Sequence, residues 1–308
     1  MDYLYLIIGF VILLSSGDLL VKGGVALSSH FKISTLVVGV TVISFGTSAP
    51  ELFVSLGAAL SGSPDIAIGN VVGSNISNIA LVLGFTAILL PLPVKSNSLK
   101  FDWPVMMGAS LLFVAFAQNN LIETWEGIVF LILLVAFMIF TVMKSRGNES
   151  EEFKKPKQSI FMAIVLIVLA SVGLYFGADL LVGAAKNIAR GYGVSERVIA
   201  LTLVAFGTSV PELATSVIAA LKKEMDISVG NIIGSNIFNI LGVLGLSSVV
   251  KNIFVSNDVL NFDLIWMLAI SFLLFLLVLP IKKAKLHRWK GFVLVLVYTI
   301  YIFFIFAQ

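Results

Sequence analysis

The sequence predicts an all-α polytopic membrane protein with ten transmembrane helices arranged as two inverted five-helix repeats. Of its 308 residues, 59% are hydrophobic and only 12% are charged, and a soluble domain carries about twice that share of charge. Ten mostly apolar runs reach the length of about 20 residues that a bilayer requires, and a polar motif of the first half recurs in the second. The same composition, with no cysteine, excludes a disulfide scaffold, a cysteine-ligated metal site and a disordered protein.

The expected helices follow the apolar runs in chain order. They lie at about 3–27, 33–61, 66–91, 101–118, 125–143, 160–184, 194–221, 227–250, 262–281 and 289–307. The first run ends in Ala26-Leu27-Ser28, which has the small residues of a signal-peptide cleavage site. We nevertheless predict a helix there, because Asp2 precedes the run without any Lys or Arg and the run has a counterpart in the middle of the chain.

The loops between the runs predict the orientation. Sixteen of the 20 Lys and Arg residues fall into alternate loops, and the other side holds only Lys186, Arg190, Arg197 and Lys251. Because positively charged loops stay in the cytoplasm, we expect a cell-membrane protein with both termini outside. The polar stretch 144–159 is then a cytoplasmic linker between a first repeat, 1–143, and a second repeat, 160–308. Topology explains the basic loops, so we expect no nucleic acid as a partner, and the absence of a GxxxxGK[ST] loop argues against a nucleotide.

Self-similarity is the strongest signal in the sequence. The segment GTSAPEL, which contains Glu51, recurs 161 positions later as GTSVPEL, which contains Glu212. Between 46–84 and 207–245, 23 of 39 residues are identical without a gap. Each half then holds five helices, and an odd number inverts the second half in the membrane. Inverted repeats are typical of secondary transporters, whose substrate sites lie near the midplane where the repeats meet.

Glu51 and Glu212 each lie near the middle of an apolar run. A carboxylate at that depth costs several kcal/mol unless it meets a cation, a proton or a water-filled cavity. The proline before each glutamate removes a backbone hydrogen bond, and we expect this to free carbonyls around Ser44 and Ala205, which could bind a cation.

Hydroxyls and amides accompany the two glutamates. Thr47 and Ser48 precede Glu51 by four and three residues, and helical winding would place both hydroxyls near that carboxylate. Helices 3 and 8 carry polar residues at every fourth position: Asn70, Ser74 and Asn78, and Asn231, Ser235 and Asn239. Such a stripe either binds ions or holds helices together. Both interpretations stay open for Asn70, Asn75, Asn231 and Asn236. Ion binding is favoured one turn deeper, for Ser74, Asn78, Ser235 and Asn239.

The remaining acidic residues receive structural interpretations. Asp18 and Asp179 lie toward the ends of apolar runs, with Lys22 close to Asp18, and we expect them to pair between helices or at helix ends rather than to bind ions. Asp65 and Asp226 open helices 3 and 8, where a negative charge stabilises the N-terminal end of the helix dipole.

The donor inventory predicts a site for hard cations. Carboxylate, hydroxyl, amide and carbonyl oxygens suit calcium, which accepts six to eight oxygens, and also suit sodium. Two negative charges match one calcium ion, and sodium competing for the same oxygens gives a physical route to antiport. Copper and zinc fit poorly, because Cys is absent and the two histidines, His30 and His287, lie outside the apolar runs. We expect Ca²⁺ and Na⁺ as transported substrates, and no cofactor.

The paired GTS[AV]PEL and GSNIxN segments resemble the alpha repeats of the calcium/cation antiporter superfamily, specifically of its sodium/calcium exchanger branch. The two alpha motifs correspond to 44–84 and 205–245, and the resemblance covers nearly the whole chain. It implies sodium-driven calcium transport by alternating access, with ions held among helices 2, 3, 7 and 8. Carried over by position, it implies an ion site of Ser44, Thr47, Ser48, Glu51, Ser74, Asn78, Ala205, Thr208, Ser209, Glu212, Ser235 and Asn239, in which Ser44 and Ala205 contribute backbone carbonyls.

One departure from the family pattern bears on ion coupling. Some members carry Asp at the position of Asn239, and the amide here leaves the number and type of coupled cations open. The resemblance implies that potassium-dependent members use an acid at this position. We therefore expect exchange without potassium.

Three other functions compete with this interpretation. A proton/calcium exchanger of the same superfamily typically carries a Gly-Asn version of the GTS triplet, whereas this chain has Thr-Ser twice. An intramembrane hydrolase would need a motif such as GxGD or HExxH, and neither occurs. A cation channel would conduct without a counter-ion on the opposite side, so a flux measurement distinguishes it.

Overall fold

The computed structural model describes residues 1–146, 156, 158–194, 205–280 and 284–307. Within these ranges eight helices are long and apolar enough to cross a membrane, and a ninth span is the pair Thr35–Thr47 and Ala49–Ser61, bent by 47°. The eight helices are Asp2–Phe31, Asp65–Leu89, Ser98–Asn119, Thr124–Ser145, Ile160–Gly191, Met225–Val250, Val259–Val278 and Arg288–Phe306. They follow the order of the predicted runs, and the predicted helical membrane fold is confirmed.

Of the seventh predicted run, 194–221, the structure describes 194 and 205–221. There α11 (Ala205–Thr208) and α12 (Val210–Leu221) form the equivalents of α3 (Ser44–Thr47) and α4 (Ala49–Ser61), 161 positions earlier. Residues 195–204 lie outside the described part of the chain. A tenth spanning helix is compatible with this arrangement.

The two halves contain equivalent elements in the same order. Besides α3 and α4, the first half consists of α1 (Asp2–Phe31), α2 (Thr35–Val38), η1 (Gly39–Ile43), α5 (Pro64–Ser77), η2 (Asn78–Leu83), α6 (Gly84–Leu89), β1 (Leu92–Pro93), η3 (Ser98–Asp102), α7 (Trp103–Phe116), η4 (Ala117–Asn119), β2 (Leu121–Ile122) and α8 (Thr124–Arg146). Besides α11 and α12, the second half consists of α9 (Ile160–Gly191), α13 (Met225–Phe238), η6 (Asn239–Leu244), α14 (Gly245–Val250), β3 (Ile253–Phe254), η7 (Val259–Asp263), α15 (Leu264–Val278), β4 (Lys285–Leu286) and α16 (Arg288–Ala307). The π-helical segments η2 and η6 are 161 positions apart, so irregularities of the backbone recur with the sequence repeat.

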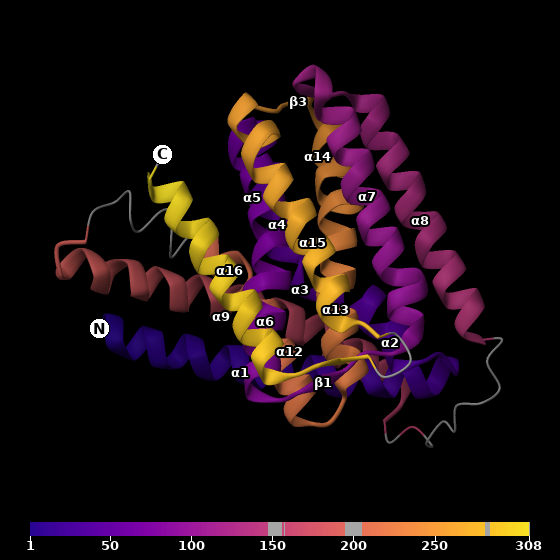
Figure 1. The fold of residues 1–308 in the computed structure, drawn as a ribbon. Coiled ribbons are helices and arrows are strands. Elements are labelled where there is room, and N and C mark those ends of the chain that lie inside the picture. The colour runs from indigo at the N-terminus through magenta and orange to yellow at the C-terminus, as the bar shows by residue number, and fades with distance from the viewer. Residues whose placement is uncertain (147–155, 157, 195–204, 281–283, 308) are drawn as a thin grey trace.

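Two short ribbons connect the halves at opposite ends of the molecule. Strand β1 pairs with β4, and β2 pairs with β3, both antiparallel. Strands β1 and β3 are equivalent by the offset of 161, yet they lie at opposite ends of the helix bundle (Figure 1). Inverted repeats place equivalent loops on opposite sides of a membrane, so this arrangement is the one that the odd helix count predicts.

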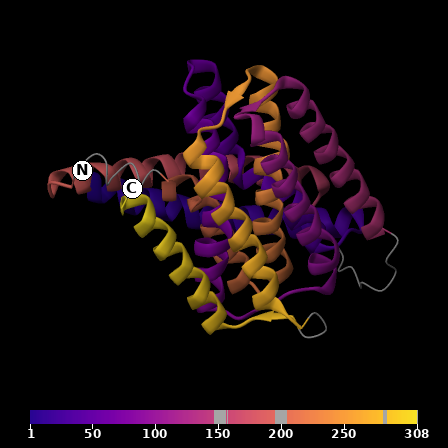
Figure 2. The same cartoon turned by 45° about the horizontal axis from the view of Figure 1, so that its top comes forward.

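Helices α1 and α9 form a long pair that lies across the other helices, as both ribbon views show (Figures 1 and 2). Their backbones approach closely at Gly9, where a Cβ atom would lie 2.7 Å from the backbone nitrogen of Leu181. Only glycine permits that approach, and small residues at such contacts are typical of helix packing in membranes.

Two helical spans, Asp65–Leu89 and Met225–Val250, form the centre of the bundle and are surrounded by the other helices. In the most apolar window of Met225–Val250, 89% of the residues are buried, and in that of Asp65–Leu89, 78% are buried. The other six long spans have only 17–33% of their windows buried. Polar residues on the two central helices are therefore shielded from lipid, whereas the outer helices present apolar side chains to it.

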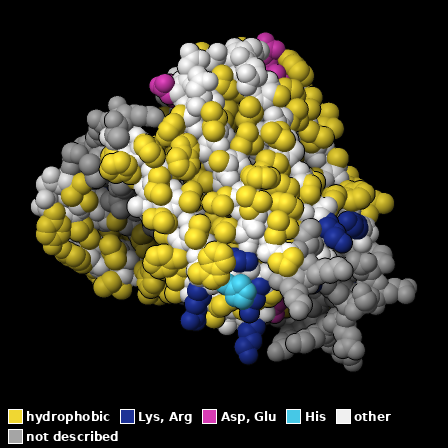
Figure 3. Space-filling view, viewed as in Figure 1, with side chains coloured by type: hydrophobic (Ala, Val, Ile, Leu, Met, Phe, Trp, Pro, Cys, Tyr) yellow, Lys and Arg dark blue, Asp and Glu magenta, His cyan; other side chains and the backbone are white. Residues whose placement is uncertain are grey.

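Charged and hydrophobic side chains occupy different parts of the surface. In Figure 3 hydrophobic side chains cover the middle of the molecule, most of the visible Lys, Arg and His side chains gather toward the end that carries β1 and β4, and most of the visible acidic side chains lie at the other end. The basic end holds the loops that we expect to be cytoplasmic.

Ion pairs at helix ends agree with the structural interpretation of two acids. Asp18 contacts Lys22 on its own helix at 2.6 Å and Lys222 at the end of α12. Asp226, at the start of α13, pairs with Lys95 at 2.8 Å. The Asp18–Lys222 pair connects α1 to the end of α12, as predicted for Asp18.

Candidate functional site

The two GTS-PEL segments break their helices at equivalent serines. Ser48 has φ −88° and ψ 8°, and Ser209 has φ −87° and ψ 1°, so each departs from helical winding between two helical pieces. A proline in the first turn of α4 and of α12 lacks the N–H that would continue the preceding helix. The breaks place the glutamates in the first turns of α4 and α12.

The prediction that proline frees the Ser44 carbonyl is wrong. This oxygen accepts hydrogen bonds from the Ser48 N–H at 2.9 Å and from the Thr47 hydroxyl at 3.2 Å. A proline lacks the N–H that donates to the carbonyl four residues earlier in a helix, so Pro50 leaves the carbonyl of Gly46, and not that of Ser44, without this donor. In the second repeat, Ala205 begins α11 and only its backbone placement is described.

Glu51 and Glu212 are both fully buried, with no exposed surface. The Glu212 oxygen Oε1 accepts hydrogen bonds from Ser48 at 2.8 Å and from Ser235 at 3.4 Å. Its other oxygen and both oxygens of Glu51 have no hydrogen-bond partner. Two buried carboxylates with three unpartnered oxygens between them therefore belong to this site.

Ser48 behaves differently from the helical expectation. Its hydroxyl donates to the carboxylate of the opposite repeat, Glu212, rather than to Glu51 three residues ahead. The departure from helical winding at Ser48 explains this, since it turns the side chain away from its own helix. The break thus directs hydroxyls across the boundary between the repeats.

Further hydrogen bonds join the repeats around the glutamates. The Thr47 hydroxyl donates to the Asn231 oxygen Oδ1 at 3.0 Å and lies 3.4 Å from the Ser235 hydroxyl. The hydroxyls of Ser74 and Thr208 are hydrogen-bonded at 3.2 Å. Each of these contacts links one broken helix to the central helix of the other repeat.

For two of the four asparagines with both interpretations open, Asn70 and Asn231, the hydrogen bonds of the side-chain amide hold helices together. Asn70 donates to the Ser55 hydroxyl at 2.9 Å and to the backbone carbonyl of Glu51 at 3.1 Å. Asn231 donates to the Ser216 hydroxyl at 3.1 Å. These bonds join each broken helix to the central helix of the same repeat, which is the packing role.

The deeper amides present their oxygens without partners. Asn78 and Asn239 are fully buried, and each begins a π-helical segment, a feature that is frequent at functional sites. Their Nδ2 atoms donate to Asn236 and Asn75 respectively, each at 3.2 Å. Their Oδ1 atoms make no hydrogen bond.

On the predicted ligand residues, six buried side-chain atoms have no hydrogen-bond partner, and all six are oxygens. They are Glu51 Oε1 and Oε2, Glu212 Oε2, Asn78 Oδ1, Asn239 Oδ1 and Ser209 Oγ. All but the Ser209 hydroxyl are acceptors only, so a cation satisfies them and an anion does not. Among the described residues no group of three or more His, Cys, Asp or Glu side chains is close enough to bind a metal, so any cation here depends on amides and hydroxyls as well as carboxylates.

Sequence reasoning missed several supporting residues. Ser55 and Ser216, which accept the amide hydrogen bonds that hold helices together, are 161 positions apart, as are Met106 and Met267, which contact Asn236 and Asn75. The repeat offset was the signal that could have identified them.

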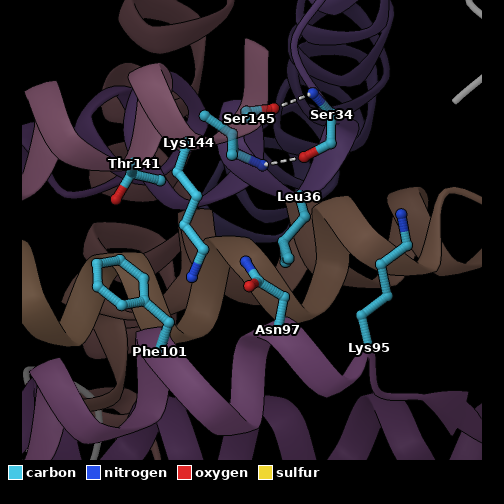
Figure 4. A pocket seen from close by; sticks show the side chains of 9 residues that line it. Ser34, Leu36, Lys95, Asn97, Phe101, Thr141, Lys144 and Ser145 are labelled. Atoms are coloured by element: carbon cyan, nitrogen blue, oxygen red, sulfur yellow. Dashed lines mark hydrogen bonds between the residues drawn. The ribbon is translucent and has the colours of Figure 1, made fainter. Parts of the chain in front are cut away.

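A separate cavity of about 100 Å³ lies on the lysine-rich side, and none of its lining residues belongs to this site. The start of α2, the segment before and within η3, and the end of α8 surround it (Figure 4). Lys95 and Lys144 line it, and the Lys144 ammonium lies 4.5 Å from the centre of the Phe101 ring. Two cationic side chains make it unsuited to a metal ion.

Comparison with known proteins decides the family. The sodium/calcium exchanger protein family matches residues 1–143 and 162–307. The chain belongs to this family. An exchanger of this family is a transporter and not an enzyme, and the chain is accordingly a multi-pass antiporter of the calcium/cation exchanger superfamily.

Individual relatives of this exchanger span almost its full length. The uncharacterized membrane protein MJ0091 of Methanocaldococcus jannaschii is 37% identical over 96% of this chain and 95% of its own length. The sodium/calcium exchanger MaX1 of Methanosarcina acetivorans is 31% identical over 99% and 98%. A solved structure of the sodium-calcium exchanger NCX_Mj superposes with a TM-score of 0.84 at 34% identity, covering 98% of this chain and 97% of that one.

One relative is named as an exchanger that uses protons. The Ca(2+)/H(+) antiporter ChaA of Bacillus subtilis is 26% identical over 65% of this chain and 63% of its own length. Because relatives carry both kinds of name, similarity alone does not decide between sodium and protons as the driving ion.

Proposed function

We propose that this chain exchanges sodium for calcium across the membrane by alternating access, without potassium. The observation that carries the proposal is the set of unpartnered acceptor oxygens on Glu51, Glu212, Asn78 and Asn239, all fully buried in the interior of the bundle. Two carboxylates at this depth carry a cost of several kcal/mol unless a cation neutralises them. One calcium ion or a set of sodium ions supplies that charge.

The proposed ligand set extends beyond the unpartnered oxygens. It comprises Ser44, Thr47, Ser48, Glu51, Ser74, Asn78, Ala205, Thr208, Ser209, Glu212, Ser235 and Asn239. All twelve would contribute a side-chain or carbonyl oxygen, the hard donors that calcium and sodium prefer, and the Ser44 carbonyl would do so beside the hydrogen bonds that it already accepts. Hydroxyls now bonded to each other, such as Ser74 and Thr208, turn their lone pairs to a cation when one binds.

Sodium is favoured over protons by the hydroxyls of the GTS segments. Thr47, Ser48, Thr208 and Ser209 add four hydroxyl oxygens around two carboxylates. A proton needs only the carboxylate oxygen itself, whereas sodium needs a cage of several oxygens. The names of MaX1 and NCX_Mj as sodium/calcium exchangers also support this choice over proton coupling.

Independence from potassium rests on charge. Asn78 and Asn239 are neutral amides, so the two glutamates carry all the formal charge at the site. Asp18 pairs with two lysines at the end of the bundle, and a charge engaged there is not available to a potassium ion bound beside calcium.

Orientation and location belong to the same proposal. The lysine-rich end with β1 and β4 faces the cytoplasm of a cell membrane, and both termini lie outside. The proposed linker 144–159 would then be cytoplasmic, and 147–155 and 157 within it lie outside the described residues.

Calcium flux in proteoliposomes tests the proposal. Purified protein is reconstituted, vesicles are loaded with sodium, and calcium-45 uptake is measured after dilution into choline. We expect uptake to require the outward sodium gradient and to stop when sodium is equal on both sides. Uptake driven equally well by an outward proton gradient without sodium would instead identify a proton/calcium exchanger.

A further inference from the structure

We propose that Asn75 and Asn236 are positioning residues, each of which holds the amide of a proposed ion ligand with its oxygen toward the ion. Asn75 would orient Asn239, and Asn236 would orient Asn78. This inference rests on the proposed function, because it assigns the two inner amides to cation binding.

The geometry consists of two equivalent hydrogen bonds that cross between the repeats. Asn239 Nδ2 donates to Asn75 Oδ1, and Asn78 Nδ2 donates to Asn236 Oδ1, both at 3.2 Å. All four side chains are at least 98% buried, so water does not compete for these bonds. The two donors, and likewise the two acceptors, are 161 positions apart, so the same bond forms once in each direction between the repeats.

An amide needs such a bond, whereas a carboxylate does not. One end of the Asn side chain is an acceptor oxygen and the other is an NH₂ donor. Rotation by half a turn would aim positively polarised hydrogens at a cation. A partner that accepts from Nδ2 excludes the rotated state and leaves Oδ1 free, as found for both Asn78 and Asn239.

Methionine sulfur atoms fix the orientation of the positioning residues themselves. Asn75 Nδ2 lies 3.8 Å from Met267 Sδ and 3.4 Å from the backbone oxygen of Asn236. Asn236 Nδ2 lies 3.6 Å from Met106 Sδ. A thioether sulfur only accepts, so it draws the NH₂ end of each positioning amide toward itself and leaves the oxygen for the inner amide.

The arrangement is a relay of three side chains on each side of the site. One relay runs from Met267 on α15 through Asn75 on α5 to Asn239 at the start of η6. The other begins at Met106 on α7. Helices that contribute no proposed ligand thus take part in selecting the orientation of two ligands. Sequence spacing alone places Asn75 and Asn236 off the ligand stripe and gives no hint of this role.

A purely structural role for Asn75 predicts a different outcome from a positioning role. If the bond only joins helices, its loss weakens the fold regardless of what occupies position 239. If the bond orients an amide, its loss matters while residue 239 is Asn and much less when it is Asp, because both carboxylate oxygens accept.

The test is a double-mutant cycle of Asn75→Leu and Asn239→Asp, read by equilibrium binding of calcium-45 to the purified full chain in detergent. In the Asn239 background we expect Asn75→Leu to raise the calcium Kd by about tenfold, the equivalent of one buried hydrogen bond. In the Asn239→Asp background we expect the same substitution to change the Kd by less than about threefold. Asn236→Leu with Asn78→Asp repeats the cycle on the other side.

Thr86→Val serves as the matched control, because Thr86 is buried and its hydroxyl donates only to the Val82 carbonyl of the preceding turn. We expect its calcium Kd to remain unchanged. Should Asn75→Leu fail to fold, Met267→Leu removes the sulfur acceptor at similar volume and is expected to raise the Kd by about threefold.

The outcomes separate the two proposals. An unchanged Kd in Asn75→Leu, or an equal rise in both backgrounds, overturns the positioning role while leaving the exchanger function intact. Failure of the unsubstituted protein to bind calcium contradicts the proposed function itself.

Discussion

Ser48 donates its hydroxyl proton to Glu212 at 2.8 Å, across the boundary between the two repeats. The equivalent residues in the other direction, Ser209 and Glu51, make no such bond, since the Ser209 hydroxyl and both Glu51 oxygens lack partners. Two halves that share the GTS-PEL motif therefore adopt different hydrogen bonding at their centre. An inverted-repeat exchanger that alternates between two states is expected to be asymmetric in each of them, with the roles of the halves exchanged in the other.

We predict that Glu51→Gln and Glu212→Gln each reduce calcium exchange to below about 1% of the unsubstituted level. Each substitution removes one carboxylate that would neutralise the buried calcium ion, and removing one partner of a buried ion pair costs about 3–5 kcal/mol. The measurement is sodium-driven calcium-45 uptake in proteoliposomes. Elution as a single species in gel filtration, as for the unsubstituted protein, verifies folding. Near-normal uptake by either variant would exclude a site shared by both carboxylates.

Gly234→Ala is predicted to destabilise the protein by about 1–3 kcal/mol, the usual cost of overpacking. A Cβ atom there would lie 2.4 Å from the Val40 carbonyl oxygen and 2.6 Å from the Val40 Cα, and a backbone cannot rotate away as a side chain can. Thermal unfolding in detergent measures the effect. Gly108→Ala is the control, because Gly108 is exposed on α7 and its added Cβ meets nothing within 4 Å. Equal unfolding temperatures for the two variants would contradict the close packing of η1 against α13.

Orientation can be tested with single cysteines, since the chain has none. We predict that an impermeant thiol reagent added to intact cells labels a cysteine appended after Gln308 and spares Ser150→Cys in the linker. Permeabilised cells, in which both positions should react, provide the control. Labelling in the reverse pattern would invert the topology that the lysine distribution predicts.

Exchange should not require potassium, because the amides at positions 78 and 239 add no charge to that of the two glutamates. We expect sodium-driven calcium flux to be unchanged when external potassium is replaced by choline, with valinomycin holding the voltage fixed wherever potassium is present. A several-fold loss of flux without potassium would mean that another acid reaches the site, and Asp179 would be the first residue to substitute.

The repeat explains why much of this architecture could be predicted from one sequence. The recurrence of Glu51 as Glu212 fixes both the inverted topology and the pairing of the central carboxylates, because an odd number of spans separates them. Hydropathy gives the spans themselves, since lipid exposure requires apolar residues over a fixed length.

Contacts between the halves could not be predicted in the same way. Ser48 bonds to Glu212 rather than Glu51, and Asn75 bonds to Asn239 rather than to its own helix. Both depend on how two helices are placed in space, which periodicity along one helix does not encode. The prediction for the Ser44 carbonyl is wrong for a local reason. The carbonyl that Pro50 deprives of its donor is that of Gly46, and the Ser44 carbonyl accepts from the N–H of Ser48.

Competition between sodium and calcium at equilibrium tests the central claim, that one set of buried oxygens serves both ions. Calcium-45 bound to the purified protein is measured while sodium is raised and choline maintains the ionic strength. We predict that sodium displaces calcium completely and with a Hill coefficient above one, because more than one monovalent ion must replace each divalent ion. Calcium that stays bound at saturating sodium would contradict the shared site.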